Sequence, residues 1–293
     1  MQLKHAQNTE RNVKMKRITN DLLTNFEEYL QNEEKAAATV DKYMRDVKSF
    51  ADWSTDRDLT KSLVLEYKGH LTQRYAPASV NSVISSLNHF FSYLEWFDLR
   101  VKSLKIQKQI FASTEKELTK TEYERLLTAA KGRHNQRLYL LMQTICSTGI
   151  RVSELRFITA EAVRDGRAMI HCKGKNRSVF LPRQLCILLR QYLKEQKRNS
   201  GPVFISKNGN PLDRSNIWAD MKHVCESAGV SAQKVFPHNL RHLFARTYYH
   251  IQKDIVRLAD ILGHTSVNTT RIYTMETGEI HRRQIQKLGL LRC

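Results

Sequence analysis

Two short motifs place arginines where they can hold an anion. The segment TGIRVSEL (residues 148–155) has a glycine turn just before Arg151, and Glu154 lies three residues further on the same predicted helical face. The carboxylate can therefore hold the guanidinium, although such a pair is more often an exposed contact that contributes little to stability. The segment PHNLRH (237–242) puts a histidine and Arg241 on one face at the start of a predicted helix, where backbone N–H groups also favour an anion.

Two histidines and a tyrosine extend this set. His238 stands in the second motif, His264 follows the glycine that ends the next predicted helix, and Tyr273 comes nine residues later. A single tyrosine in such a place is more often a half-buried packing residue. A tyrosine hydroxyl has a pKa of about 10 and is rarely ionised at neutral pH, so it needs nearby positive charge to become a nucleophile. Arg151 and Arg241 would supply that charge.

Taken in chain order, these residues resemble the active-site pattern of the tyrosine recombinase (phage integrase) family. The pattern is an arginine in T-G-x-R-x-S-E-L, a lysine on a β-hairpin, then H-x-L-R-H, L-G-H and a tyrosine nine residues later. Leu243 stands where a small hydroxyl residue is commoner and Cys172 where glycine is commoner. These departures leave Lys175 as an alternative to the hairpin lysine Lys173. The resemblance covers most of the chain and assigns the catalytic residues Arg151, Lys173, His238, Arg241, His264 and Tyr273, supported by Glu154.

The resemblance implies a reaction without metal or ATP, in which Tyr273 attacks a DNA phosphodiester and forms a 3′-phosphotyrosyl intermediate with a free 5′-hydroxyl. Two guanidiniums can hold the non-bridging oxygens, where charge grows in the transition state, and losing one such donor typically costs about 3 kcal/mol. A lysine at a hairpin tip can protonate the leaving oxygen, so Lys173 is the expected general acid. His238 would assist as an acid or base, His264 as a donor to the phosphate, and Glu154 would orient the surrounding groups.

Duplex DNA is the partner that the resemblance implies, with a homotetramer on two sites, one dimer per site, and strand exchange through a Holliday junction. The layout most resembles Xer-like and transposon or integron-type integrases. A type IB topoisomerase-like relaxing enzyme, which works as a monomer, and a DNA-binding architectural protein without catalysis stay open as alternatives. Accessory proteins, the target site and the natural event, whether integration, excision, transposition or dimer resolution, are not fixed by the sequence.

Four amphipathic helices are predicted between Thr19 and Trp96. Apolar residues recur there at helical spacing, behind N-caps at Thr39 and Thr60 and a first-turn proline, Pro77. Such stripes are typical of a helix-bundle core, and the resemblance identifies the bundle as a SAM-like core-binding domain. A charged stretch, residues 100–116, is predicted to be an exposed linker.

The second half is predicted to be a mainly α domain with one small antiparallel sheet. A capping box, Thr119 to Glu122, opens its first helix. Two β-rich runs, 168–172 and 177–181, predict a hairpin with lysines at its tip. Further helices are expected at 184–194, 215–227, 239–252 and 254–262. We expect a basic disordered arm in 1–17, the core-binding domain with its linker in 18–112, and the catalytic domain in 113–293.

Composition agrees with a DNA-binding protein of two domains. The chain has 293 residues, a formal net charge of +19 and 41% hydrophobic residues, and residues 111–293 carry a net +16 of that charge. It has no apolar run long enough for a membrane span and no secretory signal, so we expect a cytoplasmic protein; the five scattered cysteines fit reduced thiols. The amphipathic tail after Tyr273 would either cap its own domain or, as the resemblance implies, dock as a helix on a neighbouring protomer.

Overall fold

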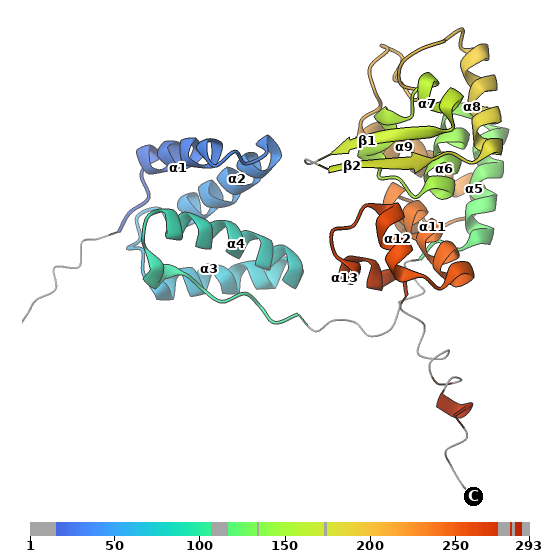
Figure 1. Cartoon of the computed structure of the whole chain (residues 1–293). Coiled ribbons are helices and arrows are strands. Elements are labelled where there is room, and N and C mark those ends of the chain that lie inside the picture. Colours follow the sequence, from blue (N-terminus) through green and yellow to red (C-terminus); the bar gives the residue numbers. More distant parts are fainter. Residues whose placement is uncertain are drawn as a thin grey trace, which may run out of the picture. The chain divides into compact units, whose positions relative to one another are not determined.

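The computed structural model describes residues 16–106, 117–133, 135–172, 175–274, 282 and 285–288, without the side chains of Cys172 and Lys175. The chain divides into two compact units, residues 1–108 and 109–293 (Figure 1). Both units are mainly helical where they are described, which confirms the predicted fold class. None of the helices in these ranges has the length and apolar character to cross a membrane.

Three predictions fall mainly outside the described residues. Residues 1–15 of the predicted arm, the predicted boundary near residue 112 and most of the tail after Thr274 belong to this group. The placement of the predicted catalytic lysine, Lys173, lies outside them as well, and of its alternative Lys175 only the backbone is described.

The first unit is a bundle of four helices around an aromatic and aliphatic core. Thr19 and Thr60 cap α1 and α3 by accepting hydrogen bonds from Leu22 N and Leu63 N, and Pro77 opens α4 as predicted. The predicted cap at Thr39 is wrong. The helix begins earlier, at Ala37, with Ala36 as its N-cap, because the run of alanines before Thr39 favours helix. The elements are α1 (Asn20–Asn32), α2 (Ala37–Trp53), α3 (Lys61–Arg74), α4 (Pro77–Tyr93) and a short 3-10 turn, Phe97–Leu99.

The start of the predicted linker packs on this bundle. Val101 is buried, and the side-chain amide of Asn88 on α4 bonds both its N–H (2.9 Å) and its carbonyl (2.8 Å). Asn81 does the same for Leu104, at 2.7 and 2.9 Å. The prediction of an exposed linker from residue 100 is therefore wrong for Val101 and Leu104, whose backbone groups two α4 amides satisfy, whereas the other residues of 100–106 are exposed as predicted.

The second unit surrounds a core cluster that includes α6, and a two-stranded antiparallel sheet lies at its surface (Figure 1). The predicted hairpin is present, with a register that runs from Arg167 opposite Phe180 to Cys172 opposite Lys175. Its second strand begins at Lys175, two residues before the predicted start. The capping box at Thr119 and Glu122 is confirmed. The predicted helix 215–227 is broken at Val224 into two. The elements are α5 (Lys120–Gly132), α6 (Gln136–Thr148), the 3-10 helix η3 (Val152–Phe157), α7 (Ala160–Asp165), β1 (Arg167–Cys172), β2 (Lys175–Phe180), α8 (Arg183–Glu195), α9 (Arg214–His223), α10 (Cys225–Ala228), a 3-10 turn (Ala232–Lys234), α11 (Pro237–Gln252), α12 (Ile255–Leu262), α13 (Val267–Thr270) and the 3-10 turn η5 (Arg271–Tyr273).

Gly149 lets α11 approach the end of α6 closely. It ends α6 in the left-handed conformation, with φ +65°, and a Cβ there would lie 2.3 Å from the ring of Phe244 on α11. A side chain at this position would therefore push α11 away. The contact brings the N-terminal half of α11, which carries the PHNLRH motif, against the turn that precedes Arg151.

Candidate active site

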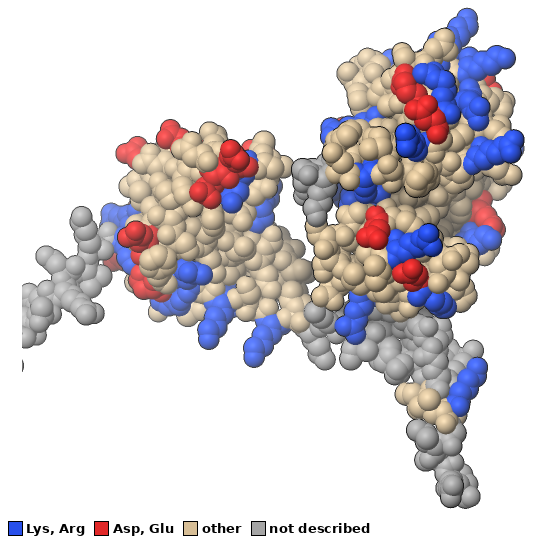
Figure 2. Space-filling view, in the orientation of Figure 1, with Lys and Arg blue, Asp and Glu red and all other residues tan. Residues whose placement is uncertain are grey.

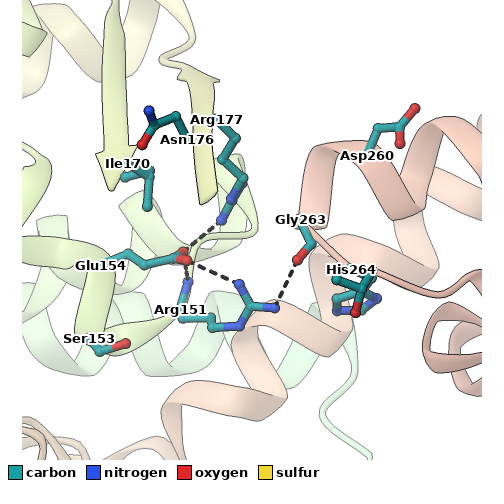
Figure 3. A pocket seen from close by; sticks show the side chains of 10 residues that line it. Arg151, Ser153, Glu154, Ile170, Asn176, Arg177, Asp260, Gly263 and His264 are labelled. Carbon is teal, nitrogen blue, oxygen red and sulfur yellow. Dashed lines mark hydrogen bonds and ion pairs between the residues drawn. The ribbon is translucent and has the colours of Figure 1, made fainter. Parts of the chain in front are cut away.

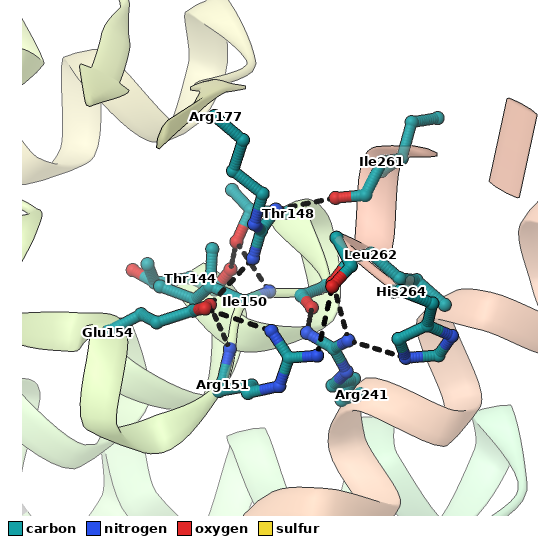
Figure 4. Close-up of polar contacts among 12 residues, drawn as sticks. Thr144, Thr148, Ile150, Arg151, Glu154, Arg177, Arg241, Ile261, Leu262 and His264 are labelled. Carbon is teal, nitrogen blue, oxygen red and sulfur yellow. Dashed lines mark hydrogen bonds and ion pairs between the residues drawn. The ribbon is translucent and has the colours of Figure 1, made fainter. Parts of the chain in front are cut away.

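Arg241 lies in the interior of the second unit and is 1% exposed. Its Nη1 donates to the Gly149 carbonyl at 2.6 Å and its Nη2 to the Leu262 carbonyl at 2.8 Å (Figure 4). Burial lowers the pKa of Arg241 to about 10 and the neighbouring Arg151 acts in the same direction, while Tyr273 and Glu154 oppose the change. The guanidinium therefore stays charged at neutral pH while being held in a fixed orientation.

Arg151 and Glu154 form the predicted pair, with Nη1 to Oε1 at 3.0 Å and the Arg151 N–H to Oε2 at 2.8 Å. The Glu154 side chain is 1% exposed and that of Arg151 is 41% exposed, so the interpretation as a surface ion pair is wrong for the carboxylate. Arg151 Nη2 also donates to the Gly263 carbonyl at 3.3 Å. The guanidinium is thus fixed on one side and open to solvent on another.

A third arginine, Arg177 on β2, completes the cluster and was missed by the sequence analysis. Its Nη2 donates to Glu154 Oε2 at 2.6 Å and its Nη1 to the Ile261 carbonyl at 2.5 Å (Figure 4). Alternation along β2 places Arg177 on the same face as the buried Val179. A charged residue on the apolar face of a strand is the signal that could have found it.

The C-terminal end of α12 organises the arginine cluster, by which we mean Arg151, Arg177 and Arg241. Three consecutive carbonyls, those of residues 261, 262 and 263, accept from Arg177, Arg241 and Arg151 in that order. The last carbonyls of a helix lack partners within the helix and carry partial negative charge. With Glu154 they hold like-charged side chains together, and the surplus positive charge suits a phosphate anion.

His264 contacts Arg241 through one ring nitrogen and Thr270 through the other. Arg241 Nη2 lies 3.0 Å from His264 Nε2, and Nδ1 lies 2.8 Å from Thr270 Oγ1 (Figure 4). A guanidinium only donates, so Nε2 must accept and Nδ1–H must donate to the hydroxyl. Burial, followed by the repulsion of Arg241 and Arg151, lowers the pKa of His264 to about 4. The neutral ring thus holds Arg241, whereas the sequence analysis expected it to donate to a phosphate.

Tyr273 is 4% exposed and packs in a small cluster with Ala245, Leu258 and Leu262. Its ring stacks on His264 at a centroid distance of 6.1 Å. The structure thus brings the predicted tyrosine against a predicted histidine, and that histidine in turn accepts a hydrogen bond from Arg241 of the arginine cluster.

His242 is a further site residue that the sequence analysis did not single out. Its ring meets Tyr273 edge to face at 4.8 Å and lies 4.4 Å from the ring of His238. Within the described residues its Nε2 is buried and has no hydrogen-bond partner. Burial lowers the pKa of His242 to about 4, with His238 and Arg241 acting in the same direction.

His238 lines a cavity of about 410 Å³ together with Arg151 and Arg241. Arg214 and Trp218 of α9 form its opposite wall. Partial burial of the ring, followed by the charges of Arg241, Arg151 and Arg214, lowers the pKa of His238. His238, with its lowered pKa, therefore faces the same space as three arginines, Arg151, Arg214 and Arg241.

A second cavity, of about 650 Å³, lies on the other side of Arg151, between the hairpin and the end of α12 (Figure 3). Glu154, Arg177 and His264 line it, with Asn176 near the hairpin tip. Figure 2 shows more Lys and Arg than Asp and Glu on the drawn face of the second unit, in line with the net +16 of residues 111–293. Fold and site together describe a helical protein with a cluster of three arginines close to a buried tyrosine.

Comparisons with known proteins give this arrangement a family. The sequence model of the phage integrase family matches residues 116–279, and that of the phage integrase N-terminal SAM-like domain matches residues 23–97. Tyrosine recombinase XerA of Thermococcus kodakarensis is 31% identical over 93% of this chain and 96% of its own length. Tyrosine recombinase XerD of Halalkalibacterium halodurans is 26% identical over 82% and 87%. The chain belongs to the phage integrase family, and it is a tyrosine recombinase.

Solved structures agree on the fold. XerH site-specific recombinase bound to its difH substrate matches with a TM-score of 0.68 and 21% identity, over 92% of this chain and 84% of that one. A lambda integrase dimer bound to a COC′ core site matches with a TM-score of 0.71 and 18% identity, over 89% and 96%. The family and the fold class inferred from the sequence are thereby confirmed.

Proposed function

We propose that this protein cuts and rejoins duplex DNA through a covalent bond between Tyr273 and a 3′-phosphate, and exchanges strands between two sites through a Holliday junction. The observation that carries the proposal is the stacking of the Tyr273 ring on His264, whose Nε2 accepts a hydrogen bond from Arg241. Arg241 belongs to a cluster of three arginines that the buried Glu154 carboxylate helps to hold. Positive charge beside a phenol favours the nucleophilic form and receives the phosphate.

In the proposed reaction the Tyr273 oxygen bonds to phosphorus while the bond from phosphorus to the 5′-oxygen breaks. Arg151 and Arg241 hold the non-bridging oxygens as charge accumulates on them. His238, whose lowered pKa keeps it neutral, acts as the nearby acid or base. Lys173 delivers the proton to the leaving 5′-oxygen, with Lys175 as the alternative.

His264 and Glu154 act through the arginines in this proposal. The neutral His264 ring holds Arg241 and Glu154 holds Arg151, so neither has to touch the phosphate. Removing either should therefore change how the arginines are presented, while the arginine charge itself remains.

The proposed assembly is a dimer on each site and a tetramer on two sites. One solved structure with the same fold is a lambda integrase tetramer bound to a Holliday junction, with a TM-score of 0.71 and 18% identity. Accessory proteins and docking of the tail on a neighbouring protomer belong to the same proposal. The monomeric relaxing enzyme and the non-catalytic DNA-binding protein have no comparable support.

The decisive experiment traps the covalent intermediate. The site is first selected by binding from a random duplex library and then rebuilt as a nicked suicide substrate. The wild type should form an adduct that resists SDS, and Tyr273→Phe should form none while binding with normal affinity. Tyr249→Phe, a change on a partly buried neighbour of the same cluster, is the matched control and should react normally. A normal adduct yield from Tyr273→Phe would remove this residue from the mechanism.

The general acid is tested separately, with Lys173→Ala and Lys175→Ala as matched variants. A substrate whose leaving 5′-oxygen is replaced by sulfur needs little protonation, so it should restore cleavage only to the variant that has lost the acid. Rescue of Lys175→Ala alone would transfer the role to Lys175.

A further inference from the structure

We propose that Arg177 is a positioning residue of the recombination reaction. It fixes the Glu154 carboxylate and the end of α12, so that Arg151 is presented to the scissile phosphate in one orientation. The inference rests on the proposed function and adds to it a residue that the family motifs quoted above do not include.

Arg177 joins three elements that are separate in the sequence. It extends from β2, where it lies opposite Ile170, to Glu154 on η3 and to the Ile261 carbonyl on α12 (Figure 4). The two bonds leave from different terminal nitrogens, and the side chain is 15% exposed. A planar fork with fixed donor directions can make both bonds at once, whereas a lysine offers one point charge.

The stem of Arg177 is enclosed as firmly as its end. A Cβ built on Gly263 would lie 2.6 Å from both Cδ and Nε of Arg177. Gly263 also supplies the carbonyl that receives Arg151 Nη2. The same glycine therefore makes room for Arg177 and receives Arg151, which ties the placement of one arginine to that of the other.

Arg177 acts on Arg151 through the carboxylate that they share. Glu154 Oε1 receives Arg151 Nη1, and Oε2 receives both the Arg151 N–H and Arg177 Nη2. Without Arg177, this 1% exposed carboxylate loses its second guanidinium and can rotate away from the orientation that fixes Arg151. Arg177 is not among the residues that line the cavity shared by Arg151, His238 and Arg241, so its effect on a phosphate held there is indirect.

The test compares Arg177→Lys and Arg177→Met with the wild type on the suicide substrate. The lysine keeps the charge and the methionine keeps an unbranched stem beneath Gly263, but neither can make both hydrogen bonds. The rate of covalent adduct formation should fall about 100-fold in both variants, as expected for a displacement of about 1 Å in a reacting group. Half-site binding should remain normal. Arg167→Lys, a change at an exposed position of the partner strand β1, is the matched control and should leave the rate unchanged.

Two chemically altered substrates separate positioning from a general loss of structure. A methylphosphonate at the scissile position removes one non-bridging charge and so lowers the demand on the arginines. The defect of both Arg177 variants should shrink on it, and should persist on a substrate with a sulfur leaving group. Rescue by sulfur alone would overturn the proposal, because Arg177 would then serve the lysine on the hairpin.

A defect of equal size on all three substrates, together with a lower melting temperature, would also overturn the proposal, since it would show a structural role. Rates are compared at a temperature at which circular dichroism shows every variant folded, and the methionine variant, which buries no new charge, serves if the lysine variant is unstable. Adduct formation by the wild type tests the proposed function itself. The ratio of variant to wild type tests Arg177, so the two failures are distinguishable.

Discussion

Each unit of this protein buries a carboxylate beside basic side chains, and the two sites use it differently. In the first unit Asp46 is 7% exposed and accepts from Lys42 Nζ at 2.9 Å and from Ser86 Oγ at 2.9 Å. Lys42 also donates to Ser86 Oγ and to the Ser82 carbonyl, both at 2.7 Å. The three donors of the ammonium group are thus used between α2 and α4.

In the second unit Glu154 faces two arginines directly, and a third lies beside them on the same helix end. The carboxylate neutralises only part of that charge, and Arg151 opens onto two cavities. The buried ion pair of the first unit therefore links two helices, because its donors are all used within the protein. The ion pair of the second unit can form part of a binding site, because uncompensated positive charge there faces a cavity.

Removal of a basic group should have the largest effect on cleavage, and only in the second unit. Arg241→Ala should slow covalent adduct formation about 100- to 1,000-fold, because a preorganised donor to the phosphate is lost. Lys42→Ala should leave the rate of cleavage unchanged and lower only the melting temperature. Single-turnover cleavage at saturating protein measures the first effect and thermal denaturation the second. Similar rates of adduct formation for Arg241→Ala and Lys42→Ala would show that the two buried ion pairs do not differ in function.

Neutralising the buried carboxylate of each unit should give a smaller difference in cleavage rate between the two units. Glu154→Gln should slow cleavage about 10- to 100-fold, because Arg151 and Arg177 lose the group that aligns them. Asp46→Asn should lower the free energy of unfolding by about 1.5–3 kcal/mol, the range for hydrogen bonds to a charged group, without changing the rate of cleavage. Urea denaturation and the kinetics of adduct formation, measured on the same preparations, give the two quantities. A slower cleavage rate in Asp46→Asn would contradict a purely structural role for the carboxylate of the first unit.

Two glycines sharpen the comparison within the second unit. Gly263 and Gly166 have similar positive φ angles, +64° and +70°, but a Cβ would meet Arg177 at the first and nothing within 4 Å at the second. Each alanine variant should lose about 1 kcal/mol of stability from backbone strain. Gly263→Ala should in addition slow cleavage about tenfold, since it displaces the arginine beneath it. Equal cleavage rates for the two variants would show that the Arg177 contact does not matter.

The smallest expected effect is the response to acid. Burial lowers the pKa of His264 and of His242 to about 4, and it also lowers that of His89 in the first unit. The unfolded chain, with histidine pKa values of about 6.5, binds protons that the folded chain does not. This contribution to stability is complete above about pH 6.5 and is lost as the pH falls toward 4.

The melting temperature of the wild type should therefore fall between pH 7 and pH 4.5. His242→Gln should flatten the dependence of the second unit and His89→Gln that of the first, as followed by calorimetry. An unchanged slope in both variants would assign the acid response to other groups.

The sequence predicted what depends on local spacing. The i,i+3 pair of Arg151 and Glu154 and the Thr119 capping box follow from neighbouring residues and are confirmed. The charged side chain on the apolar face of β2 could have singled out Arg177, but its partners could not be predicted, because they lie 23 and 84 residues away and meet only when the hairpin packs against α12. The orientation of His264 depends in the same way on Arg241, 23 residues distant. The catalytic lysine and the docking of the tail stay predictions.

The carbonyls at the end of α12 have a mechanical consequence. Because residues 261, 262 and 263 each receive a different arginine, a small translation of this helix lengthens three charge-assisted hydrogen bonds together. Such bonds weaken steeply with distance and misalignment, so the cluster should lose its order as a unit and not one arginine at a time. Any contact that shifts α12 would then disturb all three arginines together, so the site would change between an ordered and a disordered arrangement. The rate of cleavage would then change abruptly, not gradually.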